Sequence, residues 1–382
     1  MQTLNNIPTD STLTRYFKPI YEAYSVKDLP RFMNTDSRMR RLLNIVHRKA
    51  GKPLLGGNNE ALTPTPPEKR NAHKQAYIAF SGGKDCLATA IRAKQDGYSV
   101  SLCYVSGVNK SLPSEHRHAQ EAAKAAGFPF VELKVVIGGN KEYNEHPLKN
   151  LLILCVMIDA GIKQGVTAYG LGNTFDDDSV YGSLDYDLSD SYDLLKAFAY
   201  FMRGVMPDFE WLHYISNTKE SFYTVWKYDK NIIPLLSTCI TPDYRRPMIR
   251  KANIAKYGED CLNRDGCGTC YKCAFEYQMK QSFGMVRLNR AYYQRCKDAQ
   301  AHFDRNYVAD FQFDKRKYNQ YGGRNTEEVQ VLCDRCGYYI GRLKLDKVVF
   351  KYFTYKYYGG KHFQNRNEAE AVCERFKKLY RL

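Results

Sequence analysis

Short apolar runs alternate with segments of helical periodicity along the middle of the chain. Apolar runs bounded by turn residues are typical of buried strands, whereas apolar residues three and four positions apart are typical of amphipathic helices. On this basis the sequence predicts strands over 77–80, 99–105, 130–135 and 166–171, and helices over 86–94, 114–126 and 148–164. Alternating strands and helices with short turns favour right-handed βαβ units. We therefore expect an α/β fold, a doubly wound parallel sheet of Rossmann-like type.

Changes in composition divide the chain into four predicted regions. Residues 1–74 join helix-forming sequence to a linker rich in Gly, Pro and Asn, and we expect a helical N-terminal extension there. Residues 75–235 hold the alternating pattern and form the predicted α/β domain. Residues 236–285 carry closely spaced cysteines, and residues 286–382 form a basic, Tyr-rich region for which we expect an α+β domain.

The glycine turn, residues 81–86, connects a predicted strand to a predicted helix. Adjacent glycines let backbone N–H groups approach an anion closely, and the dipole of the following helix favours negative charge there. Lys84 can add a positive charge, whereas Asp85 would repel a phosphate unless a divalent cation such as Mg²⁺ lay between them. Ligands of doubly wound sheets bind at the carboxyl ends of strands, where this turn is expected. The turn thus predicts a phosphate site, with an ordinary strand-to-helix turn as the alternative.

The glycine turn has the sequence Ser81-Gly82-Gly83-Lys84-Asp85-Cys86, which lacks the spacing of the G-x-x-x-x-G-K-[ST] and G-x-G-x-x-G loops. It resembles the S-G-G-x-D-S loop of the PP-loop ATP pyrophosphatases, which cleave ATP between its α- and β-phosphates and adenylate an oxygen of their substrate. The resemblance implies that these six residues bind ATP through the leaving pyrophosphate, with Lys84 and Asp85 in catalytic roles. Cys86 stands where the family has serine, and a thiol is a weaker hydrogen-bond donor than a hydroxyl.

A second polar loop, residues 172–182, follows the predicted strand 166–171. Carboxylates such as Asp176 could hold Mg²⁺ at the mouth of a phosphate site, because Mg²⁺ prefers oxygen ligands. A solvated acidic turn with Asp as a cap is the alternative. An Asn or His followed by Asp is usual at this loop in the PP-loop family. The resemblance therefore assigns Asn173 to nucleotide binding, and Asp176 to catalysis and to Mg²⁺, together with Asp85.

A cysteine quartet at spacings C-x5-C-x2-C-x2-C gives the clearest metal signal: Cys261, Cys267, Cys270 and Cys273. Four thiolates would close a tetrahedral Zn²⁺ site of structural type, because no open position remains for a substrate. An iron–sulfur cluster is the competing occupant, since thiolate quartets hold both. The Cys-Gly-x-Cys-x-x-Cys core is similar to the zinc motif of one PP-loop branch, the 7-cyano-7-deazaguanine synthases, so we expect zinc. Pro147 and Asn150 resemble the P-x-x-N element of the same branch.

Other thiols and imidazoles carry weaker signals. Cys333 and Cys336 form a single C-x-x-C pair, which cannot close a zinc site alone, and we expect no metal there. His116 and His118 lie near the start of the predicted helix 114–126. Either histidine could contact a ligand or carry a proton, although solvent-facing positions on a helix are the commoner case.

The charge of the chain raises the question of a polyanionic partner. The net charge is +16, and residues 287–382 hold about 21 Lys and Arg against about 11 Asp and Glu. Basic residues interleaved with tyrosines suit nucleic acid, through phosphate contacts and base stacking. Core-facing strand positions with solvated lysines between them account for the pattern almost as well. Nucleic-acid contact by this region therefore stays one of two interpretations.

The N-terminal sequence and the cysteine usage bear on the compartment. The chain begins without a basic and apolar leader, and its longest apolar run is far shorter than a bilayer span. Twelve cysteines, several in C-x-x-C pairs, then favour metal binding over disulfides. We expect a cytoplasmic protein without membrane contact.

Together these features predict an adenylate-forming enzyme that uses ATP, Mg²⁺ and Zn²⁺. A substrate oxygen attacks the α-phosphorus, pyrophosphate leaves and a nitrogen nucleophile displaces AMP, while the protein positions the groups and neutralises charge. The resemblance to 7-cyano-7-deazaguanine synthases implies a deazaguanine-type acid and ammonia as substrates, in the synthesis of a modified nucleobase, as in queuosine biosynthesis. Two alternatives stay open. One is a sulfur-transferring PP-loop enzyme acting on tRNA, DNA or adenylyl sulfate, and the other is a non-catalytic nucleic-acid-binding or scaffold protein.

Overall fold

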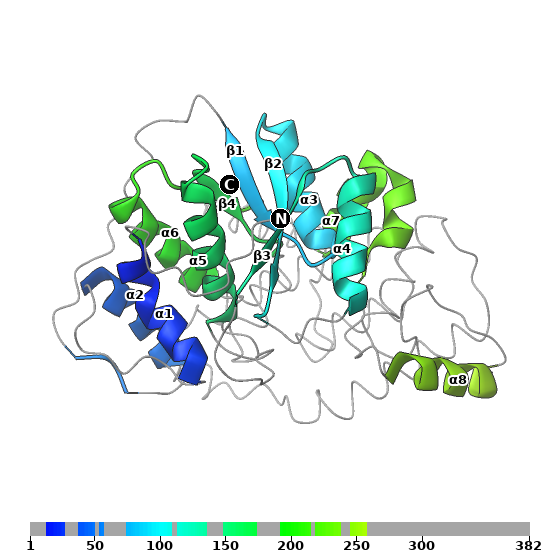
Figure 1. Ribbon diagram of the computed structural model, residues 1–382, viewed down its shortest axis with the longest axis horizontal. Coiled ribbons are helices and arrows are strands. Elements are labelled where there is room, and N and C mark those ends of the chain that lie inside the picture. The colour runs from blue at the N-terminus through cyan, green and yellow to red at the C-terminus, as the bar shows by residue number, and fades with distance from the viewer. Residues whose placement is uncertain are drawn as a thin grey trace, which may run out of the picture.

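A parallel β-sheet lies at the centre of the structure (Figure 1). The computed structural model describes residues 13–26, 37–49, 53–56, 74–108, 113–135, 148–173, 192–214, 218–237 and 245–257. The strands are β1 (Gln75–Ala79), β2 (Ser99–Ser106), β3 (Phe130–Lys134), β4 (Ala168–Gly170) and β5 (Glu210–Leu212). They form a five-stranded sheet in the order β3-β2-β1-β4-β5, and every neighbouring pair is parallel. The order reverses between β1 and β4, so this is a doubly wound sheet.

Helices cover both faces of the sheet (Figure 1). Two helices precede the sheet: α1 (Thr14–Val26) and α2 (Ser37–Lys49). Four helices connect successive strands: α3 (Lys84–Gln95), α4 (Pro113–Ala125), α5 (Lys149–Ile162) and α6 (Tyr192–Val205). After β5 come α7 (Thr218–Tyr228), the 3₁₀-helix η3 (Lys230–Leu235) and α8 (Arg246–Tyr257).

The predicted α/β class and the predicted alternation of elements are confirmed for this part of the chain. Each of the seven strands and helices predicted between 77 and 171 is present with ends within two residues of the expected ones. The glycine turn differs in one respect, because α3 begins at Lys84 and takes in its last three residues. Gly83 is the extended N-cap residue, with φ −83° and ψ 152°, so the non-helical part of the turn is residues 81–83. The four-region division stays a prediction.

Side chains alternate across the strands and build a separate core on each face. Along β1, Tyr77 and Ala79 point to the face covered by α1, α2, α5 and α6, which we call the extension face. Ile78 and the following Phe80 point to the face covered by α3, α4, α7 and η3, which we call the turn face. A parallel sheet buried on both faces explains why its strands are apolar runs and not polar–apolar alternations.

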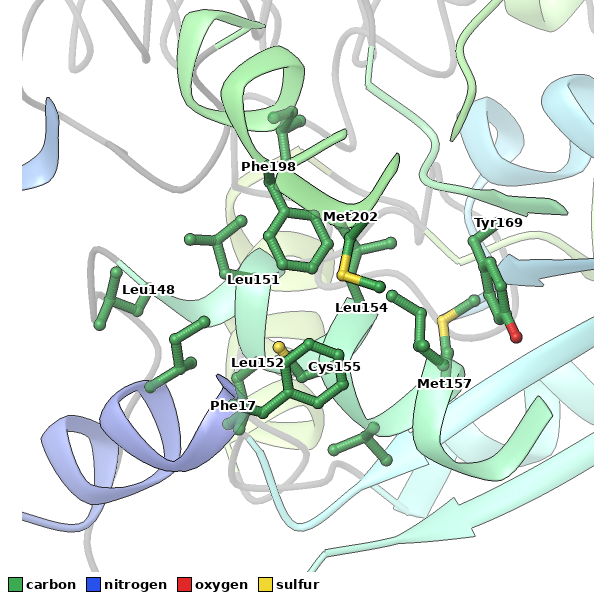
Figure 2. Packing of buried hydrophobic residues seen from close by; sticks show 14 of the residues in the cluster. Phe17, Leu148, Leu151, Leu152, Leu154, Cys155, Met157, Tyr169, Phe198 and Met202 are labelled. Atoms are coloured by element: carbon green, nitrogen blue, oxygen red, sulfur yellow. The ribbon is translucent and has the colours of Figure 1, made fainter. Parts of the chain in front are cut away.

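Helix α5 is apolar nearly all round because it is enclosed on the extension face. Figure 2 shows its leucines between Phe17 of α1, Phe198 of α6 and Tyr169 of β4. Leu151 and Leu152 are both fully buried. A helix that is buried on all sides loses the polar stripe that a surface helix carries. The N-terminal helices α1 and α2 thus share one hydrophobic core with the α/β domain.

Candidate active site

The glycine turn and the first two residues of the second loop, Gly172 and Asn173, lie at the carboxyl ends of β1 and β4, the two strands between which the order of the sheet reverses. Doubly wound sheets bind ligands in this place, because the connections leave β1 and β4 in opposite directions. The two loops touch. A Cβ atom added to Gly172 would lie 2.2 Å from the backbone nitrogen of Cys86. Glycine is therefore required at position 172 for the loops to approach this closely.

The glycine turn joins a left-handed glycine to the start of a helix. Gly82 has φ +88°, a left-handed conformation that residues with a Cβ rarely adopt. Gly83 has no side chain with which to cap α3, and the first N–H groups of a helix have no partner within the helix. The backbone N–H groups at the start of α3 can therefore bind an anion, with the helix dipole in support.

Lys84 and Asp85 form an ion pair in the first turn of α3. Lys84 Nζ lies 2.9 Å from Asp85 Oδ2, and the two side chains are only 12% and 21% exposed. Asp85 Oδ1 is buried and accepts no hydrogen bond from any residue that the structure describes. A buried carboxylate oxygen without a donor is costly, which indicates a site shaped for a cation or another donor. The donor set fits Mg²⁺, a cation that prefers carboxylate and phosphate oxygens.

Cys86 faces the second loop. A Cβ on Gly172 would lie 2.5 Å from Cys86 Sγ. Burial of the thiol, followed by the neighbouring Asp85 charge, raises the pKa of Cys86 to about 12, although hydrogen bonds with the backbones of Gly172 and Ser81 and the Lys84 charge act the other way. The thiol is therefore neutral at physiological pH. A neutral thiol is a poor nucleophile, so this position favours a structural role.

Thr89 joins α3 to the end of β4 one turn further along. Its hydroxyl lies 3.1 Å from the Asp85 carbonyl oxygen and 3.4 Å from the Leu171 carbonyl oxygen. A Thr hydroxyl that hydrogen-bonds to the carbonyl four residues earlier is common in helices. The second contact joins α3 to Leu171, the residue directly after β4. The sequence does not predict this contact, because Thr89 and Leu171 are 82 residues apart.

The two histidines of α4 have different surroundings. His118 is only 3% exposed, so the expectation of a solvent-facing position is wrong for it. Its Nδ1 lies 3.0 Å from the Leu235 carbonyl oxygen of η3, a 3₁₀-helix that packs against α4. His116 is partly exposed, and its Nε2 lies 3.2 Å from Glu132 Oε2.

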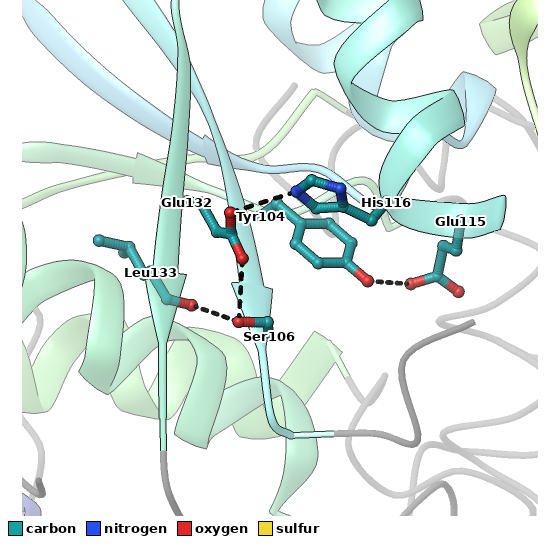
Figure 3. Close-up of polar contacts among 6 residues, drawn as sticks. All are labelled: Tyr104, Ser106, Glu115, His116, Glu132 and Leu133. Atoms are coloured by element: carbon teal, nitrogen blue, oxygen red, sulfur yellow. Dashed lines mark hydrogen bonds and ion pairs between the residues drawn. The ribbon is translucent and has the colours of Figure 1, made fainter. Parts of the chain in front are cut away.

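His116 belongs to a polar and aromatic cluster with side chains of β2 and β3 (Figure 3). Its ring contacts the rings of Tyr104 and Phe130 edge to face. Glu132 also accepts a hydrogen bond from the Ser106 hydroxyl at 3.5 Å. The cluster lies on the turn face, next to the strand from which the glycine turn departs.

The remaining predicted site residues divide into those that the structure describes and those that it does not. Asn173 directly follows Leu171 and Gly172 and is 7% exposed, which places it at the same edge of the sheet as the glycine turn. Asn150 is buried in the first turn of α5. Several predicted residues lie outside the described residues: Asp176, Pro147, Cys333, Cys336 and the quartet Cys261, Cys267, Cys270 and Cys273.

No protein-family model matches the chain, and no curated protein matches it either. Within the described ranges, no group of three or more His, Cys, Asp or Glu side chains lies close enough together to hold a metal ion. None of the helices that the structure describes combines the length and the apolar character needed to cross a bilayer.

Proposed function

We propose that this protein is an ATP-dependent adenylate-forming enzyme whose active site is the glycine turn. One observation carries the proposal. In the first turn of α3, the Asp85 carboxylate pairs with Lys84 through one oxygen and keeps its other oxygen buried without a donor among the described residues. An ion pair of this kind, at a helix N-terminus and at the reversal point of a doubly wound sheet, suits a nucleoside triphosphate bound with a divalent cation.

The residues of the glycine turn have separate parts in the proposed reaction. The backbone N–H groups that begin α3 bind the pyrophosphate portion of ATP. The positive charge of Lys84 stabilises the negative charge that develops on pyrophosphate as it leaves. Asp85 Oδ1 would hold Mg²⁺, with Asp176 as the second proposed ligand. Mg²⁺ bound there would neutralise phosphoryl oxygens. The protein therefore acts by positioning and electrostatics, without a covalent intermediate on the chain.

The substrate class follows from the sequence resemblance alone. A deazaguanine-type carboxylic acid would supply the oxygen that attacks the α-phosphorus, and ammonia would displace AMP. Zinc in the cysteine quartet of residues 261–273 would serve as a structural metal, since four thiolates leave no open position. We also propose that the basic residues 286–382 contact nucleic acid.

The sulfur-transferring alternative has less support from the described residues. Sulfur carriers act as thiolates. Burial raises the pKa of Cys103 and Cys155 well above the ordinary value, as it does for Cys86. These are the three cysteines that the structure describes, and none of them is suited to carry sulfur at neutral pH.

The test is release of AMP and pyrophosphate from ATP by the purified chain, with Mg²⁺, ammonium and a deazaguanine carboxylic acid. Lys84→Ala should lower the rate about 100-fold or more, because it removes a charge that stabilises the leaving group. Lys94→Ala is the matched control. It removes the same charge from the opposite end of α3, where Lys94 lies over the Phe128 ring, and it should leave the rate unchanged.

Three results would contradict the proposal. Full turnover by Lys84→Ala would remove the glycine turn from the chemistry. AMP release that requires RNA or DNA together with a sulfur donor would favour the sulfur-transferring class. An absence of ATP binding by the wild-type chain would leave a non-catalytic protein that keeps the fold.

A further inference from the structure

Gly82, the left-handed residue of the glycine turn, is held from two sides by elements that are distant in sequence. A Cβ atom on Gly82 would lie 3.2 Å from the backbone nitrogen of Ala119 in α4. On the other side, the backbone N–H of Ser237, just after η3, donates a hydrogen bond of 3.0 Å to the Gly82 carbonyl oxygen. The peptide that sets the shape of the turn is thus fixed between α4 and the segment that follows η3.

His118 joins those two elements to each other. Its Nδ1 lies 3.0 Å from the Leu235 carbonyl oxygen, and a carbonyl only accepts, so Nδ1 carries the proton and donates. The imidazole is 3% exposed, and Leu235 is two residues before Ser237. The bond therefore determines where the Ser237 N–H lies. In this way α4 acts on Gly82 both through its backbone and through the His118 side chain.

We propose that His118 is a positioning residue for phosphate binding, which it supports by holding the segment 235–237 against Gly82. The inference rests on the proposed function, because it assumes that the glycine turn binds pyrophosphate. His118 itself contacts no phosphate in this account. Its hydrogen bond sets the orientation of the Gly82 peptide and of the N–H groups that follow it. Loss of that bond therefore weakens phosphate binding more than it slows the chemical step.

The test is binding of inorganic pyrophosphate with Mg²⁺ to the full chain, measured by calorimetry, together with the KM and kcat for ATP. His118→Leu removes the donor to the Leu235 carbonyl. We expect pyrophosphate binding to weaken about tenfold and the KM for ATP to rise in parallel, with kcat changed less than threefold. His118→Asn places an amide N–H near the former Nδ1 and should restore binding to within about threefold of the wild-type value.

Ser237→Pro is the second variant, and it covers the case in which His118→Leu fails to fold. Proline removes the single N–H that bonds to Gly82, and Leu236, the residue before it, already has φ −73° and ψ 144°, which precedes proline without strain. It should weaken pyrophosphate binding about as much as His118→Leu does. His116→Asn, on the exposed side of the same helix, is the control and should leave pyrophosphate binding unchanged.

The outcomes separate this inference from the proposed function. If the wild-type chain binds no pyrophosphate, the proposed function fails and the inference fails with it. If the wild-type chain binds pyrophosphate and both Ser237→Pro and His118→Leu bind it equally well, only the inference is wrong. An effect on kcat alone, or no restoration by His118→Asn in a variant as stable as the wild type, would also overturn it.

Discussion

The two faces of the sheet are built from different kinds of residue. The extension face is packed with large side chains, among them Phe17, Phe198 and Phe201, all essentially inaccessible to solvent. On the turn face, α3 and α4 pack through alanines, such as Ala90 and Ala122. Small residues let backbones approach closely, which the contacts of the glycine turn with its neighbours require. Both faces bury apolar side chains, and the alanines of the turn face in addition let its helices lie close to the sheet near the glycine turn.

The buried polar contacts of the two faces also differ in how close they lie to the glycine turn. On the extension face, the Tyr21 hydroxyl donates to Asp159 Oδ2 at 2.8 Å and joins α1 to α5, far from the glycine turn in sequence and role. On the turn face, Thr89 and His118 each bond to a backbone carbonyl that borders the glycine turn. Changes to the extension face should therefore act on stability, and changes near the turn should act on activity.

The largest expected effect comes from Gly172→Ala. The new Cβ would lie 2.2 Å from the Cys86 nitrogen, so the second loop and the first turn of α3 must move apart. A displacement of about 1 Å at reacting groups lowers turnover about 100-fold, and we expect a loss of that size in AMP release. Gly56→Ala is the control, because no atom lies within 4 Å of its added Cβ. Turnover near the wild-type rate in Gly172→Ala would show that the contact between the loops is not needed.

On the extension face, Phe17→Ala should destabilise the protein by about 3–5 kcal/mol, because a fully buried aromatic side chain leaves a cavity. Urea denaturation followed by circular dichroism measures this change. Leu54→Ala, at a side chain that is 52% exposed, should change stability little. AMP release per folded molecule should stay at the wild-type rate in both variants. A loss of turnover per folded molecule in Phe17→Ala would contradict the expectation that the extension face affects stability and not activity.

The smallest effect concerns Cys86 and alkaline pH. The pKa of Cys86 is raised from 9.0 to about 12, so the folded chain holds this proton more tightly than the unfolded chain does. The resulting stability is complete below pH 9 and is lost as the pH rises through about 12. Burial also raises the pKa of Cys103, Cys155 and Tyr21. These groups therefore add to the loss of folding stability at high pH in the wild type and in its variants alike.

Cys86→Ser removes one titrating group from this decline and keeps the size of the side chain. We expect the free energy of unfolding of Cys86→Ser to fall less steeply between about pH 8 and about pH 10.5 than that of the wild type. AMP release at neutral pH should stay within about threefold of the wild-type rate, since a neutral hydroxyl replaces a neutral thiol. Identical pH profiles for the two proteins would contradict the burial of this thiol.

The sequence is a good guide to the elements and a partial guide to the site. Strand and helix ends were predictable between residues 77 and 171 because buried strands and amphipathic helices differ in the period of their apolar positions. The start of α3 was placed two residues late, since Lys and Asp suit a loop and a first helical turn equally. Asp85 could be singled out from the turn sequence, but the burial of Oδ1 depends on neighbours that only the fold assembles.

Contacts between distant segments were beyond the reach of the sequence pattern. The bond from His118 to Leu235 spans 117 residues, and nothing in the helix 113–125 marks His118 as buried and His116 as partly exposed. Gly172 carried a weak signal as a glycine directly after a strand. The reason that position 172 requires glycine is the close contact with Cys86, which depends on the fold.

The most direct test of the central claim is calorimetric binding of ATP to the wild type and to Asp85→Asn, with and without Mg²⁺. Asparagine keeps the size of the side chain but removes the charge on the buried oxygen. The account predicts that the wild type binds ATP at least about tenfold more tightly with Mg²⁺ than without, and that Asp85→Asn loses this dependence. Equal Mg²⁺ dependence in the two proteins, or no ATP binding by the wild type, would contradict it.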